Sequence, residues 1–493
     1  MPTIDKNAEA VKSFTKGFTT LFDQLVKAGG SEDFGEITPN TTSFSVVLFS
    51  GSDGAEEDPV FFEYHYVAPE APQNSTLNSN TMLPLGTLTQ LFTVYAWLVE
   101  LGDEQWGKPI TEYLPELNRV SKGEMKVQWD DITVGSLAGQ MSGLARESYS
   151  CVLSKSCGRD EFIDNFGSQP PLFLPDTTPI ISNAAFQLLA LALEANKLEG
   201  SGNTTFDSIL ATGVFGPLNM MNSGLLSSLQ DAKVSALSMI STTSDLARAG
   251  HAMLSSRLVS PATTRRWLQP VADTSNLRNS VGRPWEIYHA GQYANSSVLD
   301  VFTKTGLIGH YASYFGLAPD FNAGFTILAH DTEAARGPDL NVYADIVSLA
   351  IVQLQRLAAT EATARYVGTF GGSEGVAAFN TSRDGPGLLV TTLEAGEINL
   401  RAQIAESAGI KLEDLDFRLY PSNVGTKTQH QFVAVFQDKS APVDMGTPTC
   451  ITWQDVDSLG SSVDVRVVFT IDAFGKAINV TLNGGSLSLG RSA

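Results

Sequence analysis

The residues of greatest chemical interest lie at the start of a predicted helix, in the stretch Leu85-Gly86-Thr87-Leu88-Thr89-Gln90. Residues three apart share one face of a helix, so Thr87 and Gln90 point the same way. A Ser followed at this spacing by a Lys forms a Ser-x-x-Lys nucleophile motif, in which the amine takes the hydroxyl proton. Here a Thr and a Gln stand at the two reactive positions, and an amide has no titratable proton. The stretch has the outline of a nucleophile site without its base.

The elements around this stretch are predicted by apolar periodicity. A broad apolar face predicts the helix at Thr87–Leu101, and Gly102 stands where a glycine ends a helix. Two alternating apolar runs before it predict a hairpin of strands, at residues 43–49 and 61–66. Later strands are predicted near residues 298–303, 311–317 and 324–330, and helices at 184–198, 243–255 and 340–363.

The last third of the chain has a different pattern of apolar and turn residues. At 493 residues the chain exceeds the size at which one core stops growing, so two domains are expected. Beyond Arg365, apolar runs joined by Gly, Asp and Ser turns predict strands and a separate all-β unit. The predicted strands lie at residues 388–393, 432–436, 463–471 and 477–482, and the domain boundary is placed near residue 362.

Several segments follow the motif order of the serine β-lactamase and penicillin-binding-protein superfamily, in its class C-like branch. They are Leu85–Thr93, Trp129–Leu144, Pro175–Phe186, Gly216–Met220, Ser241–Leu246 and Lys304-Thr305-Gly306. The chain resembles that branch over residues ~40–360, and the ordered set is more specific than any single motif. It is similar in outline to fungal β-lactamase-related proteins that carry an extra C-terminal β domain.

The resemblance implies an α/β (α+β) fold, in which helices flank an antiparallel sheet and a cleft separates this part from a helical lobe. The expected domains are residues 1–362, with the helical lobe inserted at about 100–240, and residues 363–493. The second domain is expected to be a β-rich barrel or sandwich.

The resemblance also implies site residues. In the family a helix-start Ser attacks, while a Lys three residues on and a Tyr of the second motif move its proton. Thr87, Gln90 and Ile181 stand at these three positions here, whereas Asn183 and Lys304 keep the family's residue types. General acid–base help is worth ~10²–10⁴ in rate, and both usual sources are replaced together. Lys304, Thr87 and Asn183 are the candidate catalytic residues.

Each candidate has a structural alternative. Lys304 could be a solvated Lys at a strand end, and Thr87 could cap its helix. Asn183 could satisfy backbone groups in its turn. Gln90 could bond Asn183 or a ligand carbonyl, or be an inert buried amide.

The expected substrate-binding residues are Gln90, Ile181, Thr305, Gly306 and His310. His310 follows the third motif and could face the cleft, although a surface or satisfied core His is commoner. Trp285 and Glu286 are interpreted as a packing element rather than as catalysts.

Composition narrows the classes of molecule that the protein is expected to bind. The formal charge of −21 and pI near 4.6 argue against nucleic acid, because phosphate binding needs clustered Lys and Arg. No apolar run reaches the roughly 20 residues that span a bilayer. The sequence has no metal-ligand spacing and no Gly-rich phosphate loop, so no metal or cofactor is expected. The expected partner is a small-molecule substrate.

The sequence is compatible with two cellular locations for the protein. Cys151 and Cys157 have a spacing compatible with a small disulfide, with Cys450 left over. Glycosylation sequons occur, and no secretory signal is visible at the start. We expect a secreted protein if a leader has been removed, and a cytoplasmic one otherwise. The sequons are at Asn40, Asn74, Asn203, Asn295, Asn380 and Asn479.

These observations support one hypothesis for function and two rivals. The replaced residues favour a cleft that binds a small organic molecule and promotes a reaction without a covalent intermediate. Cyclisation, isomerisation or a pericyclic step on a fungal specialised metabolite would fit. The rivals are an ester or amide hydrolase or transacylase using Thr87, and a non-catalytic binding protein.

Overall fold

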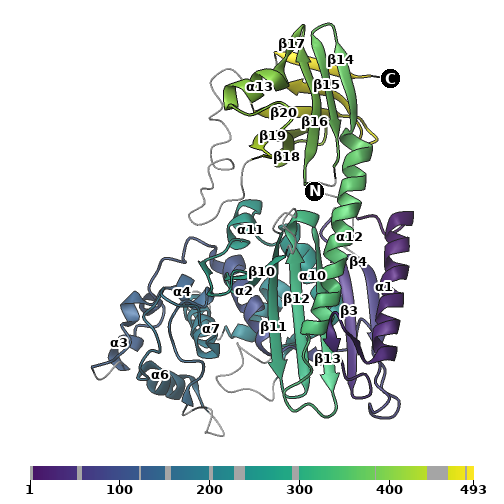
Figure 1. The fold of residues 1–493 in the computed structure, drawn as a ribbon. Coiled ribbons are helices and arrows are strands. Elements are labelled where there is room, and N and C mark those ends of the chain that lie inside the picture. Colours follow the sequence, from purple (N-terminus) through teal and green to yellow (C-terminus); the bar gives the residue numbers. More distant parts are fainter. Residues whose placement is uncertain are drawn as a thin grey trace. The chain divides into compact units, whose positions relative to one another are not determined.

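The computed structural model describes residues 4–52, 58–120, 124–149, 151, 157–198, 204–226, 239–290, 299–382, 385–440, 465–482 and 486–492 (Figure 1). These residues divide into two compact units, one of residues 4–290 and 299–353 and the other of residues 354–492. The division falls inside helix α12 (Asn341–Tyr366), and the boundary predicted near residue 362 lies in the same helix.

The first unit is built on an eight-stranded antiparallel sheet with the strand order β4-β3-β13-β12-β11-β10-β9-β8. Strands β3 and β4 form the hairpin expected from the two early apolar runs. The bounds are β3 Thr42–Ser50, β4 Val60–Tyr66, β8 Ala272–Asp273, β9 Asn279–Val281, β10 Glu286–Ala290, β11 Leu299–Ile308, β12 Tyr311–Ala318 and β13 Ala323–Asp331.

Helices cover both faces of this sheet (Figure 1). Helix α10 (Thr243–Leu254) packs on β3 and β13, and Phe49 of β3 lies on that face beside Phe315. On the other face, Phe44 of β3 contacts Phe22 of α1 (Glu9–Ala28) and Tyr343 of α12. The expected fold, an antiparallel sheet flanked by helices, is therefore confirmed. Helix α1 was not predicted.

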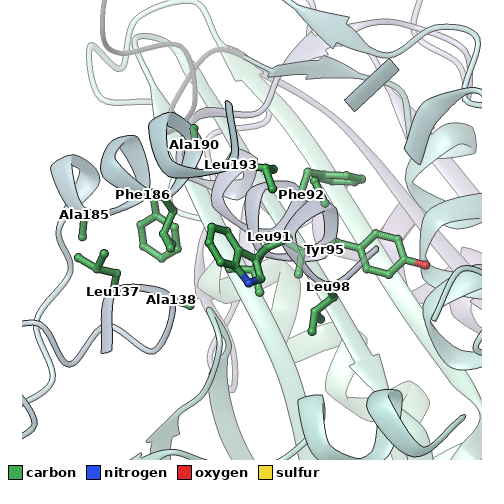
Figure 2. Close-up of a cluster of buried hydrophobic side chains, with 14 of the residues drawn as sticks. Leu91, Phe92, Tyr95, Leu98, Leu137, Ala138, Ala185, Phe186, Ala190 and Leu193 are labelled. Carbon is green, nitrogen blue, oxygen red and sulfur yellow. The ribbon is translucent and has the colours of Figure 1, made fainter. Parts of the chain in front are cut away.

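Helix α2 (Thr89–Leu101) runs through the centre of the first unit's core, and its residues from Thr89 to Leu98 are all buried. Its apolar side chains lie beside those of α4 (Val134–Ala138) and α7 (Asn183–Leu198) in the helical lobe (Figure 2). Gly102 ends α2 with a φ of 76°, a conformation that favours glycine. Further α-helices among the described residues of this unit are α3 Leu117–Val120, α6 Arg159–Gly167, α8 Phe206–Leu210 and α11 Pro261–Trp267.

The second unit is a closed β-barrel. Its strands follow the order β15-β14-β22-β21-β20-β19-β18-β16, and β16 pairs again with β15, so eight strands close the ring. Closure leaves no sheet edge among these strands, and buried Phe rings around Phe469 fill the interior. Of the two expected architectures, the structure has the barrel. The bounds are β14 Gly368–Gly372, β15 Gly375–Asn380, β16 Leu388–Ala395, β18 Leu415–Gly425, β19 Gln429–Asp438, β20 Arg466–Ile471, β21 Ala477–Leu482 and β22 Leu487–Arg491, with β17 (Ile398–Asn399) and helix α13 (Leu400–Ala408) beside them.

One helix departs from the expectation that no segment could span a bilayer. By length and composition alone, the 26-residue helix α12 is long and apolar enough. The helix also has a buried face that includes Tyr343, Ile346 and Val347, as a helix packed on a protein core does. The same pattern therefore fits a core helix.

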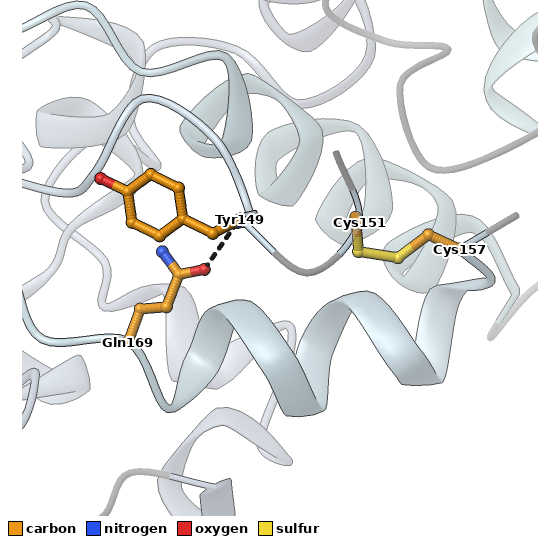
Figure 3. Close-up of a disulfide and its surroundings, with 4 residues drawn as sticks. All are labelled: Tyr149, Cys151, Cys157 and Gln169. Atoms are coloured by element: carbon orange, nitrogen blue, oxygen red, sulfur yellow. Dashed lines mark hydrogen bonds between the residues drawn. A yellow bond between two sulfur atoms is a disulfide. The ribbon is translucent and has the colours of Figure 1, made fainter. Parts of the chain in front are cut away.

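The structure joins Cys151 and Cys157 by a disulfide, with their Cα atoms 5.3 Å apart (Figure 3). Cys450 lies outside the described residues. The sequons at Asn203 and Asn295 lie outside them too. Asn40, Asn74 and Asn380 are exposed, and Asn479 is half-buried.

Candidate active site

Thr87 lies in a tight turn, Gly86–Leu88, that leads into α2. Two glycines allow this turn to approach strand β11 closely. A Cβ atom on Gly306 would overlap the carbonyl oxygen of Leu85, and one on Gly86 would lie 2.6 Å from that of Leu307. Gly86 also has a φ of 57°, which disfavours other residues. Gly306 therefore lets strand β11 and the Gly86–Leu88 turn approach each other closely, because it has no side chain.

The hydroxyl of Thr87 donates a hydrogen bond to the backbone carbonyl of Thr305, at 3.0 Å. A Thr hydroxyl has one proton, so this bond uses the proton that a base would have to remove. The hydroxyl does not cap the helix, because neither the turn nor α2 has a side-chain cap. The capping alternative is therefore wrong. The oxygen keeps lone pairs that can accept a hydrogen bond from a ligand.

Gln90 is fully buried and donates its amide to Asn183 Oδ1 at 2.8 Å. Asn183, the first residue of α7, in turn donates to the carboxylate of Glu147. Of the alternatives for these residues, the structure therefore has the Gln90–Asn183 bond, and the Asn183 amide serves side chains rather than its own turn. The Gln90 carbonyl oxygen is buried and has no hydrogen-bond donor among the described residues. That oxygen is an unused hydrogen-bond acceptor in the first turn of α2, just after the turn that holds Thr87.

The segment that carries Glu147 is fixed by Gln169. The Gln169 side chain accepts from the Tyr149 backbone at 3.0 Å (Figure 3). It also donates to the Glu147 carbonyl at 3.2 Å. The Cys151–Cys157 disulfide follows directly. Glu147 was not predicted from the sequence, because it stands 36 residues before Asn183 and shares no local motif with it.

Lys304 is not a solvated strand-end residue. Its side chain is 1% exposed, and its ammonium lies 2.6 Å from Glu286 Oε1. The other carboxylate oxygen of Glu286 accepts from the Thr305 amide at 3.2 Å and from the Thr305 hydroxyl at 2.9 Å. The interpretation of Glu286 as a packing residue is therefore wrong, although Trp285 is fully buried. The positive charge of Lys304 is already paired within the chain.

The remaining predicted residues fall in two places. Ile181 is 37% exposed, two residues before Asn183. His310 is exposed in the turn between β11 and β12, and its ring lies 6.2 Å from that of His330. The structure therefore pairs His310 with His330 and not with Thr87 or Lys304.

A tyrosine near Lys304 and Glu286 does not supply the missing base. Tyr314 is the β12 partner of Thr305, and burial raises the pKa of its hydroxyl to about 12. Nearby Glu286 acts in the same direction. The phenol therefore stays protonated at neutral pH.

A second polar cluster runs across four neighbouring strands, with one residue on each of β8, β9, β10 and β11. His289 Nε2 lies 2.7 Å from Ser280 Oγ, and His289 Nδ1 lies 2.7 Å from Asp300. These distances match a Ser-His-Asp triad. However, Ser280 donates its proton to Asp273 at 2.8 Å and not to the imidazole. Ser280 is also 2% exposed, which closes it to a substrate.

No group of three or more His, Cys, Asp or Glu side chains in the described ranges could hold a metal ion.

Comparison with known proteins identifies the family of this chain. A β-lactamase family model matches residues 55–348, more than half of the chain. The chain belongs to the β-lactamase family. A second model, for a β-lactamase-like C-terminal domain, matches residues 358–493. The resemblance stated from the sequence is therefore confirmed.

Individual relatives agree with this assignment. A β-lactamase-like protein from the fungus Arthroderma benhamiae is 25% identical over 466 residues, covering 84% of this chain and 73% of its own. Among solved structures, a class C β-lactamase is 14% identical with a TM-score of 0.52, over 71% of this chain and 98% of its own. SurE solved with D-Leu is 13% identical with a TM-score of 0.51, over 98% of this chain and 100% of its own. At these identities the solved structures show the fold alone.

Proposed function

We propose that this β-lactamase-like cleft has lost acyl-transfer chemistry and now binds a small organic molecule, promoting its reaction without a covalent intermediate. The reaction class is a cyclisation, an isomerisation or a pericyclic step, and the substrate is a fungal specialised metabolite. Such reactions need shape and well-placed hydrogen bonds more than a nucleophile.

The observation that carries the proposal is where the Thr87 proton goes. The hydroxyl donates it to the Thr305 carbonyl, which cannot act as a base. The two residues that could accept the proton in this family's arrangement are occupied or unsuitable, because Lys304 Nζ is bonded to Glu286 and Gln90 is an amide. A covalent mechanism would first have to break these bonds.

The same groups suit a non-covalent role. The half-buried Thr87 oxygen is an acceptor that a ligand hydroxyl or amine can use. Two exposed apolar side chains are close to the polar residues in the sequence: Ile181 precedes the start of α7, and Leu307 directly follows Gly306. An apolar molecule with a hydrogen-bond donor fits this combination.

A covalent probe tests the proposal. The intact chain is incubated with a fluorophosphonate and with an activated ester, and intact-mass and peptide mass spectrometry search for an adduct. We expect no adduct at Thr87. A stoichiometric Thr87 adduct would overturn the proposal.

Retention of a hydroxyl at the helix start favours one rival, a hydrolase or transacylase in which Thr87 attacks and Lys304 assists. That mechanism requires Lys304 to leave Glu286 and give up its proton. If it operates, Thr87→Ala abolishes turnover of chromogenic esters. A non-catalytic binding protein would instead show a ligand-induced rise in melting temperature with no product by mass spectrometry.

A further inference from the structure

A hollow of about 340 Å³ lies in the first unit, beside the residues that directly follow α2. Thr87 precedes the other end of this helix, so the 13 residues of α2 separate the two places by roughly 20 Å along the helix axis. The hollow is therefore distinct from the candidate active site. It is lined by Asp103, Glu104, Trp106, Arg266 and Arg283.

The two arginines of the hollow differ in their partners. Arg266 donates to both carboxylate oxygens of Asp103, to one of them at 2.8 Å, so its charge is paired within the chain. Arg283 forms no ion pair in the part of the chain that the structure describes, and its buried Nε–H has no acceptor there. A buried N–H without an acceptor is unfavourable, and a ligand oxygen would relieve this cost.

The Arg283 guanidinium is held in position by its surroundings. Its central carbon lies 5.6 Å from the centre of the Trp106 ring, in a cation–π contact. The Arg283 backbone carbonyl accepts from the Trp267 indole, and the next carbonyl, that of Pro284, accepts from Gln140 at 3.0 Å. A guanidinium that is positioned in advance reduces the entropic cost of binding a ligand.

The charges around the hollow select the kind of ligand. Burial lowers the pKa of the Arg283 guanidinium, and the charges of Asp176 and Asp103 offset only part of this effect. The group still carries its charge at neutral pH, because an arginine is not deprotonated in proteins. Asp103 and Glu104 border the same hollow and would repel a second negative charge on a ligand. One unpaired guanidinium therefore favours a ligand with a single negative charge and two acceptor oxygens, which is a carboxylate.

We infer that the hollow binds a small organic carboxylate, whose two oxygens accept hydrogen bonds from the Arg283 guanidinium beside Trp106. The half-buried indole of Trp106 adds an apolar wall, so an aromatic carboxylate fits better than acetate. The inference stands on the residues that follow α2 and on Arg283, and it holds whatever chemistry occurs at Thr87.

A fluorine label at Trp106 tests the inference. The intact chain is labelled with 5-fluorotryptophan, and the variant Trp106→Phe identifies the Trp106 signal by its loss from the fluorine NMR spectrum. Sodium benzoate is then titrated at pH 7 and constant ionic strength, with benzamide as a neutral molecule of similar shape. We expect a saturable shift of the Trp106 signal with benzoate and none with benzamide.

Arginine variants separate a specific site from a general charge effect. Arg283→Met should weaken benzoate binding about tenfold or more, because it removes the charge-assisted hydrogen bonds. Arg283→Lys keeps the charge without the planar fork, so it should weaken binding by a smaller factor. The control Arg278→Met removes an exposed arginine whose side chain contacts Tyr288, and it should change the affinity by less than about twofold.

Four results would overturn the inference. They are the absence of a saturable Trp106 shift with benzoate, an equal shift with benzamide, tighter binding of inorganic phosphate than of benzoate, and an unchanged benzoate affinity in Arg283→Met. If Arg283→Met does not fold, Arg283→Lys supplies the comparison, and an unchanged affinity in that variant would contradict the inference. A Thr87 adduct in the covalent-probe experiment would overturn the proposed function and leave this inference untouched.

Discussion

Two polar clusters at the first unit's sheet each lack a different requirement of a nucleophilic hydroxyl. The cleft cluster of Thr87, Thr305, Lys304 and Glu286 has a half-buried hydroxyl at the family's nucleophile position but no base for its proton. The relay of Asp273, Ser280, His289 and Asp300 has a hydroxyl beside an imidazole and carboxylates, but its serine is buried. Of these two clusters, only the first has the family position, and only the second has the distances of a Ser-His-Asp triad.

The difference shows that position and proton chemistry are separate requirements for a nucleophile. A hydroxyl becomes nucleophilic when a base can accept its proton and a substrate can reach it. In the cleft cluster the proton rests on a backbone carbonyl. In the relay the serine proton is donated to Asp273 and not to the imidazole.

The largest expected effect restores the missing groups in the cleft cluster. Thr87→Ser, Gln90→Lys and Ile181→Tyr together supply a serine, an amine and a phenol at the family positions. We expect chromogenic ester hydrolysis, measured as kcat/KM, to rise by about 10²–10⁴-fold over wild type. Thr87→Ser alone should give no comparable rise. No gain in a folded triple variant would show that the base is not what the cleft cluster lacks.

The next effect concerns the charge of the cleft cluster. Lys304→Met leaves Glu286 unpaired, and because that carboxylate is partly exposed we expect a loss of about 2–4 kcal/mol in unfolding free energy. Five of the six Trp residues lie in the first unit, so Trp fluorescence during denaturant unfolding reports mainly on it. The control Lys108→Met, in a solvent-exposed pair, should change stability by less than about 1 kcal/mol. Similar losses in both variants would contradict a buried, structural Lys304.

A smaller effect tests the relay. His289→Ala removes the bonds to Ser280 and Asp300, which should lower the unfolding free energy by about 1–2 kcal/mol. When His289→Ala is added to the triple variant, the rate of ester hydrolysis should be unchanged, since the relay takes no part in that reaction. A tenfold loss of hydrolysis in His289→Ala, or a fluorophosphonate adduct on Ser280, would make the relay the reactive cluster.

The smallest effect is expected at the Thr87 hydroxyl. Thr87→Val keeps the shape and removes one hydrogen bond to a carbonyl, a loss of about 0.5–1.5 kcal/mol. Thr89→Val is the matched comparison, because the Thr89 hydroxyl both donates to the Gly86 carbonyl and accepts from the Met239 amide. It should destabilise more, as measured by the same unfolding assay. The reverse order would mean that the Thr87 hydroxyl does more structural work than one bond to Thr305.

Much of the fold could be predicted because it depends on local periodicity. The apolar face of α2, its glycine stop and the β3–β4 hairpin all have signals within a few residues. Helix α1 has such a signal too, since Phe14, Phe18 and Phe22 recur every four residues and contact one another along one face, but this helix was not predicted.

The polar contacts of the site could not be predicted in the same way. Glu286 stands 18 residues before Lys304 and meets it only because β10 pairs with β11 in one register. The relay likewise depends on the alignment of four short strands. No local pattern specifies such an alignment.

The sequence by itself determined which side chains stand at the family's reactive positions, and so that an amide and an aliphatic group replace the expected base and acid. Only the tertiary structure decided where the proton of Thr87 and the charge of Lys304 go. The physical reason is that hydrogen bonds and ion pairs act over about 3 Å, and their partners here are separated along the chain and brought together by strand register.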